Sequence, residues 1–253
     1  MDIKSLNYNN IPIYYAAKSQ NLPIVVVLHG FTSNYHRQEA RTGIITKLYE
    51  NNFCVAAFDS VRHGNREGAE EFLQKESREQ EEMLFDIVVE SAMEMEEILK
   101  FIKKSGIGDG KRIGITGISM GGFIVFKTAE LTDEVRYLVP MVSSPYFEEF
   151  AKYALKKIGI ENFEEYEERF KILREVEPLK NKERFLDKNI FIMAGELDNT
   201  VPEYFSRKGY EELKELYSAN GVAEKIKYKS YSAEHCENEE MIRDMIIWFK
   251  KVL

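Results

Sequence analysis

Short, continuous apolar runs alternate with longer amphipathic stretches along most of this sequence, and that alternation limits the folds available to it. Each run is closed by a small or polar residue, as in PIVVVL before His29 and FCVAAF before Asp59. Such an order is typical of βαβ units, which wind a mostly parallel sheet with helices on both faces. We predict strands over 13–17, 23–28, 53–58, 112–118, 135–142, 189–194 and 225–230, the first of them antiparallel.

Several stretches between or after these runs carry apolar residues at helical spacing. In 79–105 the apolar side chains recur every three or four residues, so one stripe packs on the sheet while Glu and Lys face water. We predict further helices over 119–131, 204–219 and 239–252. The fold class that follows is α/β, with a doubly wound sheet.

The segment 146–188 interrupts this alternation. It is rich in Glu, Lys and aromatic residues, reads as mostly helical, and is far longer than the few residues that usually connect two elements. We predict one domain over 1–253 with a helical cap formed by 146–188. The alternative is an ordinary crossover helix with loops.

Charge and composition exclude several classes of partner. The formal net charge is −8, so no basic stripe is expected to bind nucleic acid, and a polyanionic substrate is disfavoured. No stretch approaches the roughly 18 apolar residues of a membrane span, and no secretion signal precedes the first strand. We therefore expect a cytoplasmic protein without a membrane partner, in which Cys54 and Cys236 are free thiols.

The run Gly117-Ile118-Ser119-Met120-Gly121 is the strongest chemical signal in the chain. A G-x-S-x-G pattern has meaning when a buried strand leads in and a helix leads out, because the serine then sits at the tip of a strained turn. RIGITGI and GGFIVFKTAEL meet both conditions. Ser119 is therefore the candidate nucleophile, at the edge of the sheet where such folds bind ligands.

A serine nucleophile needs a base and an acid that orients the base. Among four histidines, only His235 follows the last predicted strand, as the order Ser, acid, His requires. Asp198 lies a short loop beyond strand 189–194 and is the candidate acid, with Glu196 as its rival. No His, Asp and Glu cluster has metal-ligand spacing, so we expect no metal and no cofactor.

Backbone N–H groups must also stabilise the oxyanion that forms during acyl transfer. Met120, directly after the candidate nucleophile, supplies one. Phe31, in the His29-Gly30-Phe31-Thr32 loop after strand 23–28, is the candidate for the second. We expect Gly30 to permit the turn and the Phe31 ring to line the acyl site; the alternative is that His-Gly only ends a strand.

From Pro23 onward, the motifs HGF, FDSVRHG, GISMGG, GELDNTVP and SAEH resemble the esterase branch of the α/β-hydrolase superfamily, near its prolyl-oligopeptidase-like and dienelactone-hydrolase-like members. The resemblance implies the α/β-hydrolase fold and the same roles for the five positions named above. It also implies that FDSVRHG forms a turn that braces the active-site floor by hydrogen bonds. Dienelactone hydrolases have a cysteine nucleophile and prolyl oligopeptidases a large propeller domain, and this chain departs from both.

The function predicted from these features is hydrolysis of carboxylic esters of small to medium acyl chain through an acyl-enzyme on Ser119. A peptidase or amidase, or a lysophospholipase or thioesterase, could use the same three residues. A ligand-binding protein of the same fold is a further alternative, disfavoured by the complete residue set. The predicted partner is a small-molecule ester, and the predicted assembly is a monomer or a homodimer.

Overall fold

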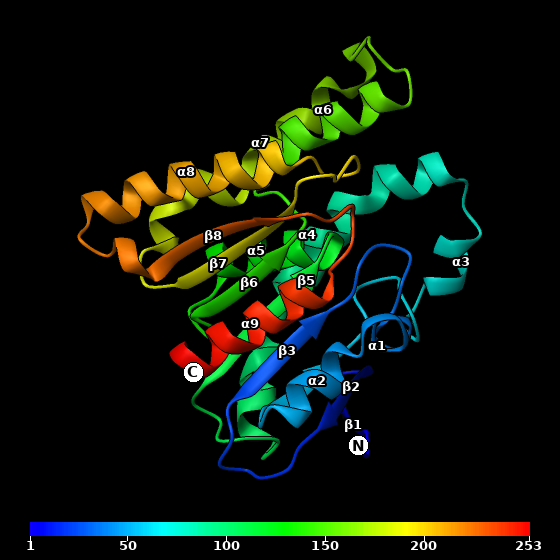
Figure 1. Cartoon of the computed structure of the whole chain (residues 1–253). Coiled ribbons are helices and arrows are strands. Elements are labelled where there is room, and N and C mark those ends of the chain that lie inside the picture. The colour runs from blue at the N-terminus through cyan, green and yellow to red at the C-terminus, as the bar shows by residue number, and fades with distance from the viewer.

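Eight strands form one sheet in the computed structural model, which describes residues 1–253 (Figure 1). Their order is β1-β2-β4-β3-β5-β6-β7-β8; β2 is antiparallel to β1 and β4, and the strands from β3 to β8 are parallel. The bounds are β1 (Lys4–Tyr8), β2 (Ile11–Ala16), β3 (Ile24–Leu28), β4 (Cys54–Ala57), β5 (Ile113–Ile118), β6 (Tyr137–Met141), β7 (Asn189–Gly195) and β8 (Ile226–Tyr231). The predicted α/β fold with a mostly parallel sheet is confirmed.

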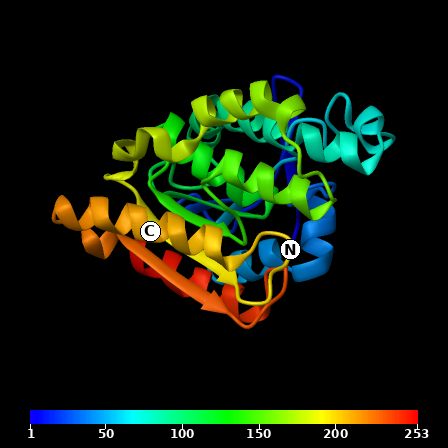
Figure 2. The same cartoon turned by 90° about the horizontal axis from the view of Figure 1, so that it is seen from above.

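Helices cover both faces of this sheet (Figures 1 and 2). Their bounds are α1 (Tyr35–Thr42), α2 (Ile44–Glu50), α3 (Ala69–Leu73), α4 (Ser77–Lys104), α5 (Met120–Leu131), α6 (Phe147–Lys157), α7 (Glu167–Val176), α8 (Glu203–Ala219) and α9 (Glu239–Val252), with short 3-10 turns η1 (Glu164–Tyr166), η2 (Pro178–Phe185) and η3 (Ala223–Lys225). None of these helices combines the length and apolarity that a membrane span requires.

The continuous apolar sequence of β3 reflects burial on both faces. Ile24, Val26 and Leu28 belong to a core shared with α4 and α5. Val25 and Val27 point to the other face and belong to a second core shared with α2 and α9. A strand covered on both sides needs apolar residues at every position, which is why β3 shows no alternation.

Sequence patterns missed β1 and the helices α1 to α3. β1 is mostly exposed, so its sequence has no apolar run from which a strand could be predicted. α1 buries only Gln38 and depends instead on its ends, where the Asn34 side chain accepts the Arg37 N–H and Gly43 adopts a left-handed conformation. All these elements are short, and β1 and α1 bury few side chains; α2 buries Ile44, Ile45 and Leu48, but its seven residues are too few to show a helical period.

The segment 146–188 is mostly helical, and its helices α6 and α7 lie at the top of the view in Figure 1. The Arg78 guanidinium donates to the Tyr166 hydroxyl at 2.7 Å, and Arg169 pairs with Asp86 at 2.7 Å. These contacts join α4 to η1 and α7. The function of this segment as a cap stays a prediction.

The turn between β5 and α5 is possible only because two residues lack side chains. A Cβ on Gly117 would lie 2.4 Å from the backbone of Gly121, and one on Gly121 would lie 2.6 Å from the Leu28 carbonyl oxygen. Both distances are shorter than real contacts allow. The strand, the helix and the end of β3 therefore approach one another at backbone distance.

We expect Gly117→Ala to lower the free energy of unfolding by about 1–3 kcal/mol, because the added methyl must displace backbone atoms. Gly30→Ala is the matched control, since its Cβ would meet its nearest neighbours at an ordinary 3.7 Å. Its effect should stay below about 1 kcal/mol in chemical denaturation. Equal effects of the two substitutions would contradict this account of the turn.

Candidate active site

Ser119 sits at the tip of the turn between β5 and α5, with φ 52° and ψ −117°. A non-glycine residue rarely holds a positive φ, and such strain persists only where the surroundings fix the backbone. Here the Ser119 N–H donates to the Met141 carbonyl at 3.0 Å, and its carbonyl accepts from Phe123 N–H at 3.0 Å. The side chain is thereby held out at the carboxyl edge of the sheet.

Three side chains from separate loops meet in a chain of hydrogen bonds at this edge. The Ser119 hydroxyl lies 2.8 Å from Nε2 of His235, and Nδ1 of His235 lies 2.7 Å from Oδ2 of Asp198. Because the carboxylate accepts, Nδ1 carries the proton and Nε2 is free to accept from the serine. The three candidates predicted from the sequence thus lie in contact.

The Asp198 carboxylate is held by the loop that carries it. Its Oδ1 accepts the N–H groups of Thr200 and Val201, each at 2.8 Å, and its side chain has no exposed surface. The rival Glu196 is exposed and accepts from the Ser230 hydroxyl at 3.1 Å. Asp198, and not Glu196, therefore reaches the histidine.

The loop after β7 and the loop after β8 are tied together by their backbones. Glu196 N–H donates to the Tyr231 carbonyl at 2.8 Å, and Leu197 N–H donates to the Ala233 carbonyl at 3.0 Å. A Cβ on Gly195 would lie 2.6 Å from that same Ala233 oxygen, so glycine allows this approach. The acid and the histidine are consequently placed relative to each other by main-chain bonds.

Glu237 is a buried carboxylate near the site that the sequence analysis missed. Its oxygens accept from Nη2 of Arg41 at 2.8 and 2.7 Å, and Gln38 donates to it as well. Burial raises the pKa of Glu237, and the Arg41 guanidinium opposes that shift. The surrounding sequence CENEE is polar and gave no sign that one of its acids turns inward. This pair anchors the chain two residues after His235.

The loop after β3 brings the second candidate donor to the site. Phe31 and Gly30 line the same cavity as Ser119 and His235, and the Phe31 N–H donates to no acceptor in the protein. Met120 is the first residue of α5, so its N–H also lacks a partner within the helix. Two backbone donors are thus available beside the serine.

The expectation that Gly30 permits the turn is wrong. Its φ lies outside the left-handed region, and a Cβ there would make only ordinary contacts. The left-handed residue is instead Thr32, with φ 54°. Sterics strongly disfavour this conformation for a β-branched residue.

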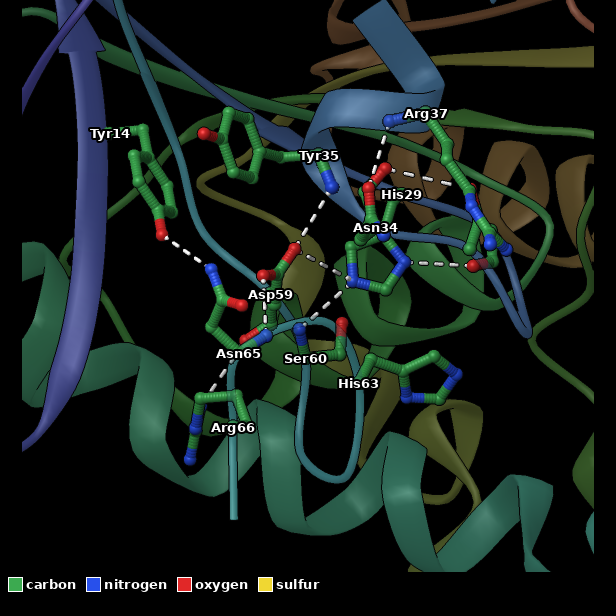
Figure 3. Close-up of polar contacts among 12 residues, drawn as sticks. Tyr14, His29, Asn34, Tyr35, Arg37, Asp59, Ser60, His63, Asn65 and Arg66 are labelled. Atoms are coloured by element: carbon green, nitrogen blue, oxygen red, sulfur yellow. Dashed lines mark hydrogen bonds and ion pairs between the residues drawn. The ribbon is translucent and has the colours of Figure 1, made fainter. Parts of the chain in front are cut away.

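The FDSVRHG segment forms a turn in which Asp59, Ser60 and His63 lie beside His29 (Figure 3). Asp59 accepts the Tyr35 N–H at 2.9 Å and the Asn65 N–H at 3.2 Å, and it thereby joins the start of α1 to the turn. Arg62 points to α4, where it pairs with Glu90 at 2.7 Å. The resemblance to the esterase branch of the α/β-hydrolases implied a hydrogen-bonded turn here, and the structure shows these hydrogen bonds.

Two buried histidines connect the turn to the loop that carries Phe31. His29 donates from Nδ1 to the Gly30 carbonyl at 2.8 Å and accepts the Ser60 N–H at Nε2 at 3.0 Å (Figure 3). His63 accepts the Thr32 N–H at Nε2 at 3.1 Å. Burial lowers the pKa of His29 to about 4, and burial together with the neighbouring His29 lowers that of His63 to about 4. Both rings are neutral at pH 7.

A cavity of about 1170 Å³ opens over Ser119 and His235. Its lining is apolar at Phe31, Ile118 and Phe123, and charged at Arg78 and Arg169. The volume slightly exceeds the roughly 300–1,000 Å³ that is typical of ligand sites in proteins. No group of three or more His, Cys, Asp or Glu side chains is placed to hold a metal ion.

The neutral histidines predict a loss of stability in mild acid. Because the pKa of His29 and of His63 is about 4 in the folded chain and 6.5 as a model value, the unfolded chain binds more protons between these pH values. Acidification to about pH 5 should therefore reduce the free energy of unfolding by about 2 kcal/mol for each histidine.

Denaturant unfolding of the wild type and of His63→Gln at pH 7.5 and about pH 5 measures this effect. The variant lacks one of the two imidazoles, so its stability should fall less on acidification. Burial raises the pKa of Asp59, which acts in the opposite sense, but this carboxylate is common to both proteins. An identical fall in both would contradict the prediction.

The chain is similar to known proteins over most or all of its length. Residues 62–253 match the model of the prolyl oligopeptidase family. A putative esterase, YitV of Bacillus subtilis (strain 168), is 26% identical over 265 residues, with both chains covered completely.

Two solved structures share the fold. TT1662 from Thermus thermophilus superimposes with a TM-score of 0.77 at 16% identity, covering 99% of this chain and 98% of that one. The Pyrococcus furiosus esterase Pf2001 has a TM-score of 0.69 at 18% identity, covering 99% and 92%. The α/β-hydrolase fold and the resemblance to its prolyl-oligopeptidase-like branch are both confirmed. The chain belongs to the prolyl oligopeptidase family of serine hydrolases and is a hydrolase of the esterase or peptidase type.

Proposed function

We propose that this hydrolase cleaves carboxylic esters of small to medium acyl chain through an acyl-enzyme on Ser119. The observation that carries the proposal is the hydrogen-bonded succession from the Ser119 hydroxyl through His235 to Asp198, at 2.8 and 2.7 Å. A serine becomes an effective nucleophile when a base within hydrogen-bond reach takes its proton. The buried carboxylate stabilises the imidazolium that this transfer creates.

In the proposed reaction, Oγ of Ser119 attacks the ester carbonyl carbon while its proton passes to Nε2 of His235. The carbonyl oxygen becomes negatively charged and accepts hydrogen bonds from the N–H groups of Phe31 and Met120. Collapse of this intermediate breaks the bond to the alcohol oxygen, which leaves with the proton from His235. A water molecule, deprotonated by His235, then attacks the acyl-enzyme and releases the acid and Ser119.

The cavity supports an ester with an apolar acyl group. Phe31, Ile118 and Phe123 line it near the serine, and its volume leaves room for the alcohol as well. The relative YitV is itself described as a putative esterase. Charged residues such as Arg78 and Arg169 in the lining disfavour a lipase that meets an apolar interface.

A peptidase or amidase is the second candidate, because the family takes its name from an oligopeptidase. The same residues would attack an amide carbonyl, and His235 would protonate the leaving amine. Turnover of p-nitrophenyl butyrate against aminoacyl p-nitroanilides decides between the two. The proposed esterase hydrolyses the ester and leaves the anilides intact, whereas a peptidase hydrolyses both, because the activated ester is intrinsically the more reactive substrate.

Ser119→Ala should lose at least about 10³-fold in kcat on p-nitrophenyl butyrate, because the attacking oxygen is absent. The folded state should persist, since the alanine Cβ replaces one already present at this strained position. Labelling by a fluorophosphonate probe should vanish in parallel. Unchanged turnover in the variant would remove Ser119 from the mechanism.

Asp198→Asn and Glu196→Gln form a matched pair for the acid. Asparagine at 198 can present an N–H to Nδ1 and favour the wrong imidazole tautomer, so kcat should fall by about 10²- to 10⁴-fold. Glu196 touches Ser230 rather than the histidine, so its variant should stay within about twofold of the wild type. A larger loss in Glu196→Gln than in Asp198→Asn would reverse the assignment.

A further inference from the structure

The buried ring of His63 contacts the loop that carries Phe31 without entering the cavity. The Thr32 N–H donates to its Nε2 at 3.1 Å, and its Nδ1 lies 2.9 Å from the Val61 carbonyl oxygen. A carbonyl can only accept, so Nδ1 bears the proton and Nε2 is left as the acceptor. His63 is 2% exposed, and its ring joins the backbone at Thr32 to the backbone at Val61.

Thr32 would not be expected to hold its conformation unaided. Its φ of 54° lies in the left-handed region, which disfavours β-branched residues. The residue is exposed, and its hydroxyl donates to the Phe31 carbonyl at 2.8 Å, so no burial of its side chain fixes it. The bond from its N–H to His63 is the contact that ties it to the protein interior.

The position of Thr32 affects the neighbouring Phe31, whose N–H is the candidate oxyanion donor and has no acceptor within the protein. The planar peptide that contains this N–H also contains the Gly30 carbonyl, which His29 holds at 2.8 Å. The peptide that follows is held at the Thr32 N–H by His63. The Phe31 ring also packs near His63, with centroids 5.8 Å apart. Release of His63 would free the Phe31–Thr32 peptide, which adjoins the donor's own peptide and restrains it from the C-terminal side.

We propose that His63 is a positioning residue for the oxyanion donor: by accepting the Thr32 N–H, it keeps the Phe31 N–H aimed at the ester carbonyl oxygen on Ser119. The inference rests on the proposed function. His63 lies in the turn that begins with Asp59 and Ser60. Asp59 accepts the N–H at the start of α1, and the Ser60 N–H donates to His29, so this turn is fixed in place (Figure 3). His63 does not line the cavity, so it acts through Thr32.

The kinetic test compares His63→Leu with His63→Gln, two side chains of similar size. Leucine cannot accept the Thr32 N–H, whereas the glutamine Oε1 can occupy the place of Nε2. We expect His63→Leu to lower kcat by roughly 10- to 100-fold with KM within about threefold, since a transition-state contact is weakened. His63→Gln should recover most of this loss. The exposed His36 provides a control, and His36→Leu should match the wild type.

Equal losses in His63→Leu and His63→Gln, no loss in either, or an effect on KM alone would overturn the proposal. Failure of the inference about His63 can be distinguished from failure of the proposed function. If the wild type hydrolyses no ester, or if Ser119→Ala stays active, the proposed function fails. If both controls behave and His63→Leu keeps its kcat, only the inference about His63 fails.

A measurement on the wild type covers the case in which His63→Leu does not fold. Nitrogen-15 spectra of the histidine side chains, with His63 identified by comparison with His63→Gln, report which ring nitrogen carries the proton. We expect a neutral ring at pH 7 with the proton on Nδ1. A proton on Nε2 would leave no acceptor for the Thr32 N–H and would refute the proposal.

Discussion

The close approach of three backbone segments at the end of β5 is the constraint on which the site depends. Gly117 and Gly121 leave no room for side chains between the strand, the first turn of α5 and the end of β3. Under this packing the Ser119 backbone keeps a positive φ that a free chain would abandon. The same packing sets the Met120 N–H, one candidate donor, directly beside the serine.

Parallel strands bring distant parts of the chain to one edge of the sheet, because each strand ends on the same side. Ser119 follows β5, Asp198 follows β7 and His235 follows β8. The strand order alone does not fix the positions of the loops that carry these three residues. Backbone bonds between the last two loops hold Asp198 and His235 relative to each other, and the half-exposed Arg41 pairs with the buried Glu237 two residues after His235.

A buried polar network supports the opposite side of the site. Asp59, His29 and His63 satisfy main-chain groups of α1, of the Phe31 loop and of their own turn. An imidazole is suited to this position because one nitrogen donates while the other accepts, and burial keeps it neutral. Unpaired, the same groups would destabilise the loop, since a buried polar atom without a partner is costly.

The sequence by itself determined the alternation of strands and helices, the position of the turn at Ser119, and the residues eligible as base and acid, because these follow from local pattern and chain order. It missed the polar elements β1 and α1, it assigned the turn after β3 to Gly30 instead of Thr32, and it left Glu196 open as a rival. Only the tertiary structure decided that Asp198 reaches His235, that Glu237 is buried, and that His29 and His63 hold the Phe31 loop. The physical reason is that burial and hydrogen-bond partners depend on segments far apart in the chain, which periodicity and motifs do not encode.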